Sequence, residues 1–162
     1  MRVIAAMSGG VDSAVAAARA VEAAVDKYLA SAKLAAAGLA TPETIVCQSV
    51  DSAVEAFGRL GGDVVLKPLF GGEGRGIARL EDEAIAQRTF SLLTGLGAVL
   101  YLQRFVPHDG WDLRVLVVGE RMWAIRRRNA LDWRTNVSRG AMAEQVELDP
   151  HWARLARCAA DA

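Results

Sequence analysis

The chain has few of the residues that hold small secreted domains together. Its 162 residues include only two cysteines, Cys47 and Cys158. Two thiols so far apart in the sequence are too few for a disulfide framework or a zinc site. No apolar run approaches the roughly 20 residues that cross a bilayer, and the apolar start has no cleavage site of a secretory signal. We therefore expect a reduced, cytoplasmic protein with no membrane partner.

The chain also lacks an excess of charge of either sign. Lysine and arginine together number 19, as do aspartate and glutamate, so the whole molecule is neither a polyanion binder nor an acidic decoy. From Arg104 to Arg139, however, eight arginines outnumber four acidic residues. This local excess favours a bounded anionic ligand over a long nucleic-acid track. Hydrophobic residues make up 52% of the chain, which is enough for one core and excludes a disordered chain.

Short apolar runs alternate with helix-forming runs along the chain. The residue pattern predicts strands at 1–7, 43–48, 63–68, 76–80, 99–106, 112–118 and 122–128. Helices are predicted at 11–37, with a break near 23–26 and a left-handed cap at Gly38, and at 50–60, 81–96 and 150–160. Residues 133–147 are predicted to be irregular. Neighbouring strands joined by a hairpin, as around Gly119, favour an α+β fold over a parallel doubly wound sheet.

A lysine and a glycine-rich loop form the most informative segment, Val64–Ile77, VVLKPLFGGEGRGI. Lys67 ends a predicted strand, and glycines follow at Gly71, Gly72, Gly74 and Gly76. Glycine lets backbone N–H groups approach a ligand, so the loop and the ammonium group can enclose the oxygens of a triphosphate. The segment is neither a Walker loop nor a dinucleotide fingerprint, because no G-K-[ST] follows it and a strand comes next. The alternative is a flexible hairpin tip with a solvated lysine.

A second polar group lies between residues 102 and 140. In strands, alternate side chains share a face, so Asp112 and Arg114 lie together, and Arg127 lies on the face opposite Arg126 and Arg128. An arginine that points inward needs an anionic partner. A loop follows that carries Arg134, Thr135 and Asn136. The pattern indicates an anion site, with a solvated basic face as the alternative.

Five segments in order resemble the ATP-grasp superfamily, and within it the RimK-like α-L-glutamate ligases. They are DKYLASAKLAAAGLATPETIV, DVVLKPLFGGEGRGI, LYLQRFV, DLRVLVVG and DWRTNVSRG, from residue 26 to about 148. The resemblance implies an ATP-grasp domain over 26–162, in which ATP lies between two α+β subdomains beneath a mobile glycine lid. It also implies γ-phosphoryl transfer to the carboxylate of an acceptor, followed by attack of glutamate or a similar amine.

The resemblance implies roles for residues on the nucleotide side. Lys27 and Lys67 correspond to the two phosphate-facing lysines, and residues 71–76 to the lid. The run Gln103, Arg104, Phe105 and Val106 corresponds to the hinge whose backbone contacts adenine. Asp112 corresponds to a ribose or hinge-side acceptor, and Arg134 and Thr135 to the part of the site loop that contacts the nucleotide.

Three residues correspond to the catalytic group of the family. Arg114 and Arg127 resemble the arginines that hold the acyl phosphate or the substrate carboxylate, and Asn136 resembles the asparagine of the site loop. The family usually has glutamate where this chain has Arg104, and a second glycine where it has Ala141. The resemblance implies that the Mg²⁺ ligands lie on a later E-x-N segment, beyond Ala162, so we predict no metal ligand among these residues.

The first 23 residues resemble a different family, the tRNA-specific 2-thiouridylases of the MnmA type. The shared segment is SGGVDS, Ser8–Ser13, the signature loop of PP-loop ATP pyrophosphatases. A strand, a glycine turn and a helix N-terminus form an anion site. The chain is thus expected to join a PP-loop-like fragment, 1–25, to an ATP-grasp domain. Three functions stay open: an ATP-dependent ligase, a tRNA-thiolating pyrophosphatase, which alone requires nucleic acid, and a non-catalytic nucleotide-binding domain.

Overall fold

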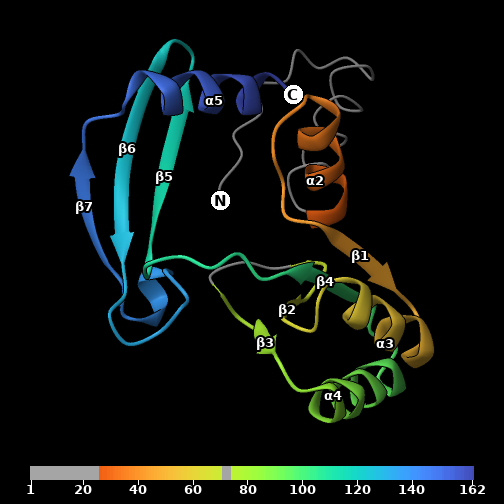
Figure 1. The fold of residues 1–162 in the computed structure, drawn as a ribbon. Coiled ribbons are helices and arrows are strands. Elements are labelled where there is room, and N and C mark those ends of the chain that lie inside the picture. The colour runs from red at the N-terminus through yellow and green to blue at the C-terminus, as the bar shows by residue number, and fades with distance from the viewer. Residues whose placement is uncertain (1–25, 71–73) are drawn as a thin grey trace, which may run out of the picture.

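Two antiparallel sheets and their helices make up the protein in a computed structural model, which describes residues 26–70 and 74–162 (Figure 1). The first sheet has the strand order β1-β4-β2-β3, and the second has the order β5-β6-β7. The segment between β4 and β5 connects them. The mixture of helices with antiparallel strands confirms the predicted α+β class. The predicted strand-loop-helix at the start of the chain lies outside the described residues.

The bounds of the elements follow the predicted ones closely. The strands are β1 (Thr44–Cys47), β2 (Val64–Lys67), β3 (Ala78–Leu80), β4 (Leu100–Arg104), β5 (Trp111–Val118), β6 (Arg121–Arg128) and β7 (Met142–Val146). The helices are α2 (Lys27–Ala36), α3 (Val50–Arg59), α4 (Glu83–Gly95) and α5 (Pro150–Asp161), with a single 3₁₀ turn, η1 (Val137–Arg139). No helix among them is long and apolar enough to cross a membrane.

The ends of helix α2 have clear causes in the sequence. The Asp26 carboxylate caps its first turn, because Oδ1 accepts hydrogen bonds from the backbone N–H groups of Tyr28 and Leu29, at 2.7 and 3.1 Å. The start at Lys27 agrees with the predicted break near residues 23–26. Gly38 follows the helix with a φ of +77°, the left-handed conformation predicted for it.

Strand β7 is the element that the sequence pattern missed. Residues 133–147 were expected to be irregular, but Met142–Val146 pairs antiparallel with β6 over five residues. Four of these five residues are exposed, so no apolar alternation marks the strand. Its backbone pairs with β6 across the loop that separates the two strands, and a local residue pattern does not report such pairing.

The main core lies between one face of the first sheet and helices α3 and α4. Val64 and Leu66 of β2 and Leu100 and Leu102 of β4 point toward the helices, where Phe90 is fully buried. Side chains alternate along a strand, so the residues between them must point the other way. These are Val65 and Lys67 on β2, and Tyr101 and Gln103 on β4. Packing of the core thus places Lys67 on the face that is opposite α3 and α4.

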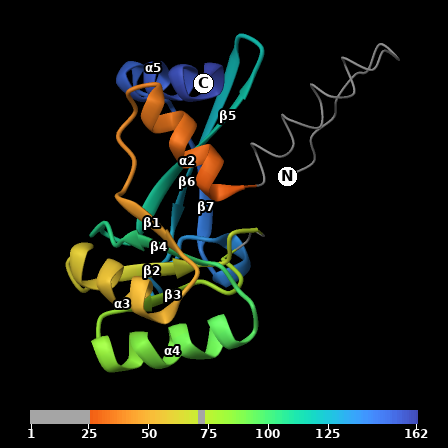
Figure 2. The same ribbon diagram turned by 90° about the vertical axis from the view of Figure 1, so that its right-hand side faces the viewer.

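Helix α2 lies over this second face. Figures 1 and 2 show α2 between the first sheet and α5, with α3 and α4 on the far side of the sheet. The hydroxyl groups of Ser31 on α2 and Tyr101 on β4 are 2.9 Å apart and hydrogen-bonded. Lys27, at the start of α2, is therefore brought to the same side of the sheet as Lys67.

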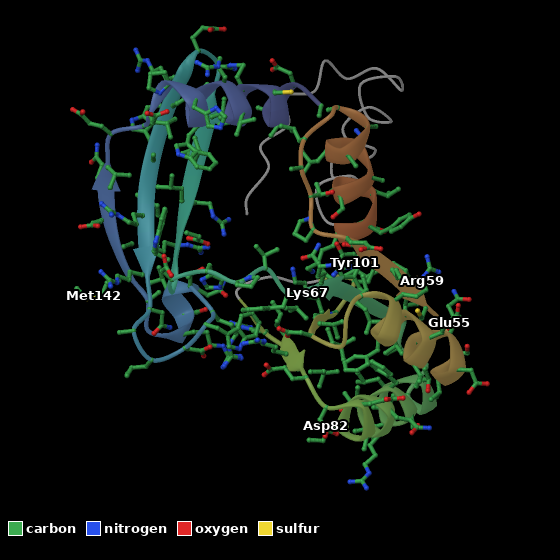
Figure 3. The ribbon with its side chains drawn as sticks, viewed as in Figure 1. Glu55, Arg59, Lys67, Asp82, Tyr101 and Met142 are labelled. Atoms are coloured by element: carbon green, nitrogen blue, oxygen red, sulfur yellow. The ribbon has the colours of Figure 1, made fainter. Side chains whose placement is uncertain are left out.

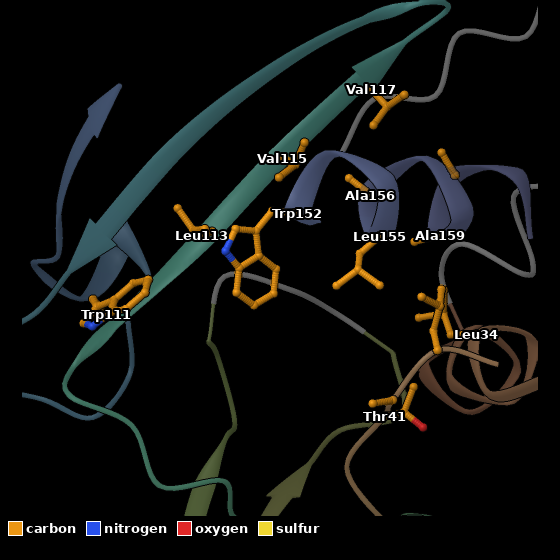
Figure 4. A pocket seen from close by; sticks show the side chains of 13 residues that line it. Leu34, Thr41, Trp111, Leu113, Val115, Val117, Trp152, Leu155, Ala156 and Ala159 are labelled. Atoms are coloured by element: carbon orange, nitrogen blue, oxygen red, sulfur yellow. The ribbon is translucent and has the colours of Figure 1, made fainter. Parts of the chain in front are cut away.

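An apolar cavity of about 790 Å³ lies between α2, β5 and α5. Figure 4 shows Leu113 and Val115 of β5 facing Trp152 and Leu155 of α5, with Leu34 of α2 nearby. The described residues that line it are uncharged. They offer no cationic side chain to a phosphate group, unlike the face of the first sheet that carries Lys67.

Candidate functional site

Two lysines from different elements lie near one another at the end of β2, an interior strand of the first sheet. Lys67 is half-buried at the end of β2, and its Nζ donates a hydrogen bond to Oε1 of Gln103 at 2.5 Å. Lys27 Nζ donates to the backbone oxygen of Leu69, two residues beyond Lys67, at 3.3 Å. Figure 3 shows Lys67 and Tyr101 beneath the lower end of α2, on the side of the first sheet nearer the second.

The pKa of Lys67 lies below its ordinary value. Burial disfavours the ammonium form, and the positive charge of Lys27 lowers the pKa further. Burial also lowers the pKa of Lys27, while Asp26 opposes that shift. None of the described acidic side chains forms an ion pair with Lys67. A half-buried ammonium group that forms no ion pair with the described residues, and that lies near a second lysine, is a place to which an anionic group would be attracted.

The described part of the glycine loop contacts the loop after β6. Gly74 is buried with a φ of +72°, and its backbone oxygen accepts a hydrogen bond from Nη2 of Arg139 at 3.3 Å. A Cβ atom at position 74 would lie 2.5 Å from Oδ1 of Asn136. Glycine is therefore required there both by the backbone conformation and by the approach of Asn136. Gly76 is described and exposed, whereas Gly71 and Gly72 lie outside the described residues.

A bidentate ion pair links β5, an edge strand of the second sheet, to the central strand β6. Asp112 on β5 lies opposite Arg127 on β6. The buried Arg127 donates from Nε to Oδ1 of Asp112 at 2.8 Å and from Nη2 to Oδ2. Thr135 Oγ1 also donates to Oδ2, at 2.8 Å. Arg114 lies on the same face as this pair, is exposed, and forms no ion pair with the described residues.

The carboxyl group of Asp112 is held ionised. Burial by itself would raise its pKa, but hydrogen bonds from Arg127 and Thr135, together with the charges of Arg127 and Arg114, lower the pKa overall. The same pair raises the pKa of Arg127, chiefly through its hydrogen bond with Asp112. Asp112 therefore remains an acceptor at neutral pH.

Asn129 shapes the loop that carries Arg134, Thr135 and Asn136. Its buried side chain donates to the backbone oxygens of Arg134 and Arg139, at 2.9 and 3.2 Å. Its Oδ1 accepts from the N–H groups of Leu131 and Asp132. Asn129 was not among the predicted site residues. An asparagine just after a strand, followed by a polar segment, is typical of a turn closed by the side chain, and that signal was available.

The predicted hinge residues point in different directions. Arg104 is exposed and forms an ion pair with Glu43, with Nη2 and Oε2 2.7 Å apart. The ring of Phe105 lies between the guanidinium of Arg79, 3.7 Å from its centroid, and the ring of Trp133, 5.8 Å away. Val106 is exposed. Phe105 thus contacts both the first sheet and the loop between β6 and β7 of the second sheet.

Two backbone N–H groups of the hinge are already bonded. The N–H of Arg104 donates to the backbone oxygen of Glu43 at 2.9 Å, and the N–H of Phe105 donates to the backbone oxygen of Asp63 at 3.0 Å.

The predicted site residue Arg134 forms an ion pair with Asp132, with Nη2 and Oδ2 2.6 Å apart. Among residues 26–70 and 74–162, no three histidine, cysteine, aspartate or glutamate side chains gather in a way that could hold a metal ion.

Comparison with known proteins decides the family. Residues 24–162 match the RimK-like ATP-grasp domain. The chain belongs to this family. The match confirms the resemblance of residues 26–148, and it begins after the segment Ser8–Ser13.

A curated relative and two solved structures agree with this family. The tetrahydromethanopterin:α-L-glutamate ligase of Methanosarcina acetivorans is 39% identical over 156 residues, which cover 87% of this chain and 47% of the relative. The RimK-domain ATP-grasp protein of Sphaerobacter thermophilus has a TM-score of 0.66 at 25% identity, covering 85% of this chain and 49% of its own. The ATP-grasp ligase PsnB, solved with a precursor variant, Mg and ADP, has a TM-score of 0.64 at 21% identity, covering 86% and 42%. The chain thus spans about half the length of the proteins it matches.

Within the RimK-like domain the predicted site residues form two clusters. Lys27, Lys67 and Gln103 belong to the first sheet and α2, and Asp112, Arg127 and Thr135 belong to the second sheet and its loop. Asn136, beside Gly74, joins the loops of the two clusters. The side chain of Arg104 lies apart from both, beside Glu43.

We expect Arg127→Met to destabilise the domain by about 1–2 kcal/mol at neutral pH. This is less than for a fully buried pair, since the Asp112 side chain is 37% exposed. Because the pKa of Asp112 is lowered by folding, the contribution of the pair is present above the ordinary pKa of aspartate, about 4, and is lost as pH falls through the folded value. Urea unfolding as a function of pH measures it.

The matched control is Arg126→Met on the same strand, where Arg126 pairs with the exposed Glu144. That variant should change the free energy of unfolding by less than about 1 kcal/mol. A stability loss for Arg127→Met that stays constant down to the acid limit would contradict the account.

We also expect Gly74→Ala to destabilise the domain more than Gly38→Ala. Both glycines have positive φ, so both substitutions cost about 1–2 kcal/mol of backbone strain. Only at position 74 does the new Cβ meet another residue, whereas nothing lies within 4 Å at position 38. The extra cost should fall when Asn136→Ala is combined with Gly74→Ala. An equal cost of Gly74→Ala with and without Asn136 would show that the two loops do not touch as described.

Proposed function

We propose that this RimK-like domain binds ATP for an ATP-dependent carboxylate–amine ligase. The observation that carries the proposal is that Lys67, half-buried and held by the neutral amide of Gln103, lies near Lys27 at the start of the glycine-loop segment. A nucleotide's polyphosphate would supply negative charge opposite the Lys67 ammonium group. ATP-grasp ligases bind ATP with Mg²⁺, and PsnB was solved with both ADP and Mg.

On the nucleotide side, Lys67 and Lys27 would contact phosphate oxygens, and backbone N–H groups of the glycine loop would cover them. The adenine base would lie at residues 103–106. Because the N–H groups of Arg104 and Phe105 already donate to Glu43 and Asp63, we place the contact with the base at Val106. The ionised Asp112 would accept a hydrogen bond from a ribose hydroxyl.

On the acyl side, Arg114 would hold the anionic groups of the reacting carboxylate. In the reaction, a carboxylate oxygen attacks the γ-phosphorus and ADP leaves. An amine nitrogen then attacks the acyl carbon, loses a proton, and releases phosphate. Fixed cationic donors stabilise both anionic transition states. Arg127 is already satisfied by Asp112, so in this proposal it fixes the carboxylate and the strand while Arg114 and Asn136 contact the substrate.

The described residues do not supply a Mg²⁺ site, since no cluster of carboxylates gathers among them. We therefore assign no step of the reaction to a metal held by this part of the chain. The amine is proposed to be glutamate, as in the name of the Methanosarcina relative, or a similar amino acid. The acceptor is proposed to carry a carboxylate.

Titration of MgATP against the wild type and Lys67→Ala tests the proposal. Loss of one charged hydrogen-bond donor to phosphate should weaken binding about 10-fold or more. The control is Lys33→Ala, an exposed lysine in the last turn of α2, which should bind like the wild type. Equal affinities of wild type and Lys67→Ala would remove the proposal.

The nucleotide product separates the alternatives. ADP formed in the presence of amines and carboxylates supports ligase chemistry, and AMP supports the pyrophosphatase chemistry expected of the Ser8–Ser13 loop. Binding of MgATP without either product supports a domain that binds the nucleotide and depends on other parts of a longer protein for turnover.

A further inference from the structure

A buried hydrogen-bond network behind Lys67 connects four elements of the fold. Gln103, only 9% exposed, accepts from Lys67 Nζ of β2 through Oε1. Its Nε2 donates to Oγ1 of Thr44 on β1 at 2.9 Å and approaches Oη of Tyr101 at 3.4 Å. Tyr101 is itself hydrogen-bonded to Ser31 of α2. The network therefore runs from the lysine of β2 to the helix that carries the second lysine.

The direction of the Gln103 amide is determined by its surroundings. Thr44 Oγ1 donates its one hydrogen to the backbone oxygen of Pro42 at 2.9 Å. The hydroxyl can then only accept from its other neighbour, so the NH₂ end of Gln103 must face Thr44. The carbonyl end must consequently face Lys67. Strand pairing supports this arrangement, because Thr44 and Val65 lie opposite Gln103, and Tyr101 lies opposite Lys67.

Because the acceptor for Lys67 is the neutral amide of Gln103, the lysine keeps its positive charge. An amide oxygen stabilises the ammonium group without cancelling its charge, whereas a carboxylate would form an ion pair and occupy the cation. The titratable groups near Lys67 are Lys27 from α2 and the Tyr101 hydroxyl on β4. Only the amide of Gln103 is recorded as an acceptor for Lys67 among the described residues.

We propose that Gln103 is a positioning residue, which holds the Lys67 ammonium group at the end of β2 and leaves its charge available to phosphate. The side chain acts through Lys67 and not through contact with adenine, although position 103 lies in the hinge. This inference rests on the proposed function for the phosphate, but the contact between Gln103 and Lys67 is independent of it.

A double-mutant cycle on MgATP affinity tests the proposal. Gln103→Met, which keeps the length of the side chain and removes the acceptor, should weaken binding about 5- to 10-fold. In a Lys67→Met background the same substitution should change the affinity less than 2-fold, because the residue through which it acts is gone. An equal loss in both backgrounds, or no loss in the wild-type background, would overturn the positioning role.

Titration of the Lys67 side chain by NMR keeps the two proposals separable. Without the acceptor the ammonium form loses a hydrogen bond, so Gln103→Met should lower the measured pKa of Lys67. Thr44→Val, which frees the amide to turn, should lower it in the same direction by a smaller amount. If the wild type does not bind MgATP, the proposed function fails while this shift still decides the positioning contact. An unchanged pKa in both variants would overturn the contact.

Discussion

The site depends on a cation that the protein holds without neutralising it. Packing of Val64 and Leu66 against α3 and α4 forces Lys67 onto the other face of the first sheet, where it is half-buried near Lys27. Charge burial of this kind is unfavourable unless hydrogen bonds or an anion compensate. Gln103 accepts the hydrogen bond but leaves the positive charge of Lys67 uncompensated. That charge is what makes this face suited to an anionic ligand.

In the second sheet, by contrast, the buried charge is paired within the protein. There Arg127 and Asp112 satisfy one another, and Asn129 satisfies the backbone of the following loop. This cluster pairs its own charges, and the loop that follows it contacts Gly74. The charged face of the first sheet and the paired cluster of the second are thus joined at Gly74 and at Phe105.

Much of this fold was predictable from the sequence, because apolar periodicity marks β2, β4, α3 and the β5–β6 hairpin. Strand β7 was not predictable, since Met142–Val146 is almost entirely exposed and depends on β6 for its hydrogen bonds. Lys67 and the glycine loop were identified by residue type and spacing, whereas Lys27 was identified only through the family resemblance. The role of the Gln103 side chain was not, because it depends on Thr44 and Tyr101, which come together only through strand pairing.

A crystal structure of the chain with a non-hydrolysable ATP analogue would show whether Lys67 binds phosphate. We expect phosphate oxygens within hydrogen-bonding distance, about 3 Å, of Lys67 Nζ, with the amide of Gln103 still facing that nitrogen. An analogue bound elsewhere, or bound with its phosphates remote from Lys67, would contradict this expectation.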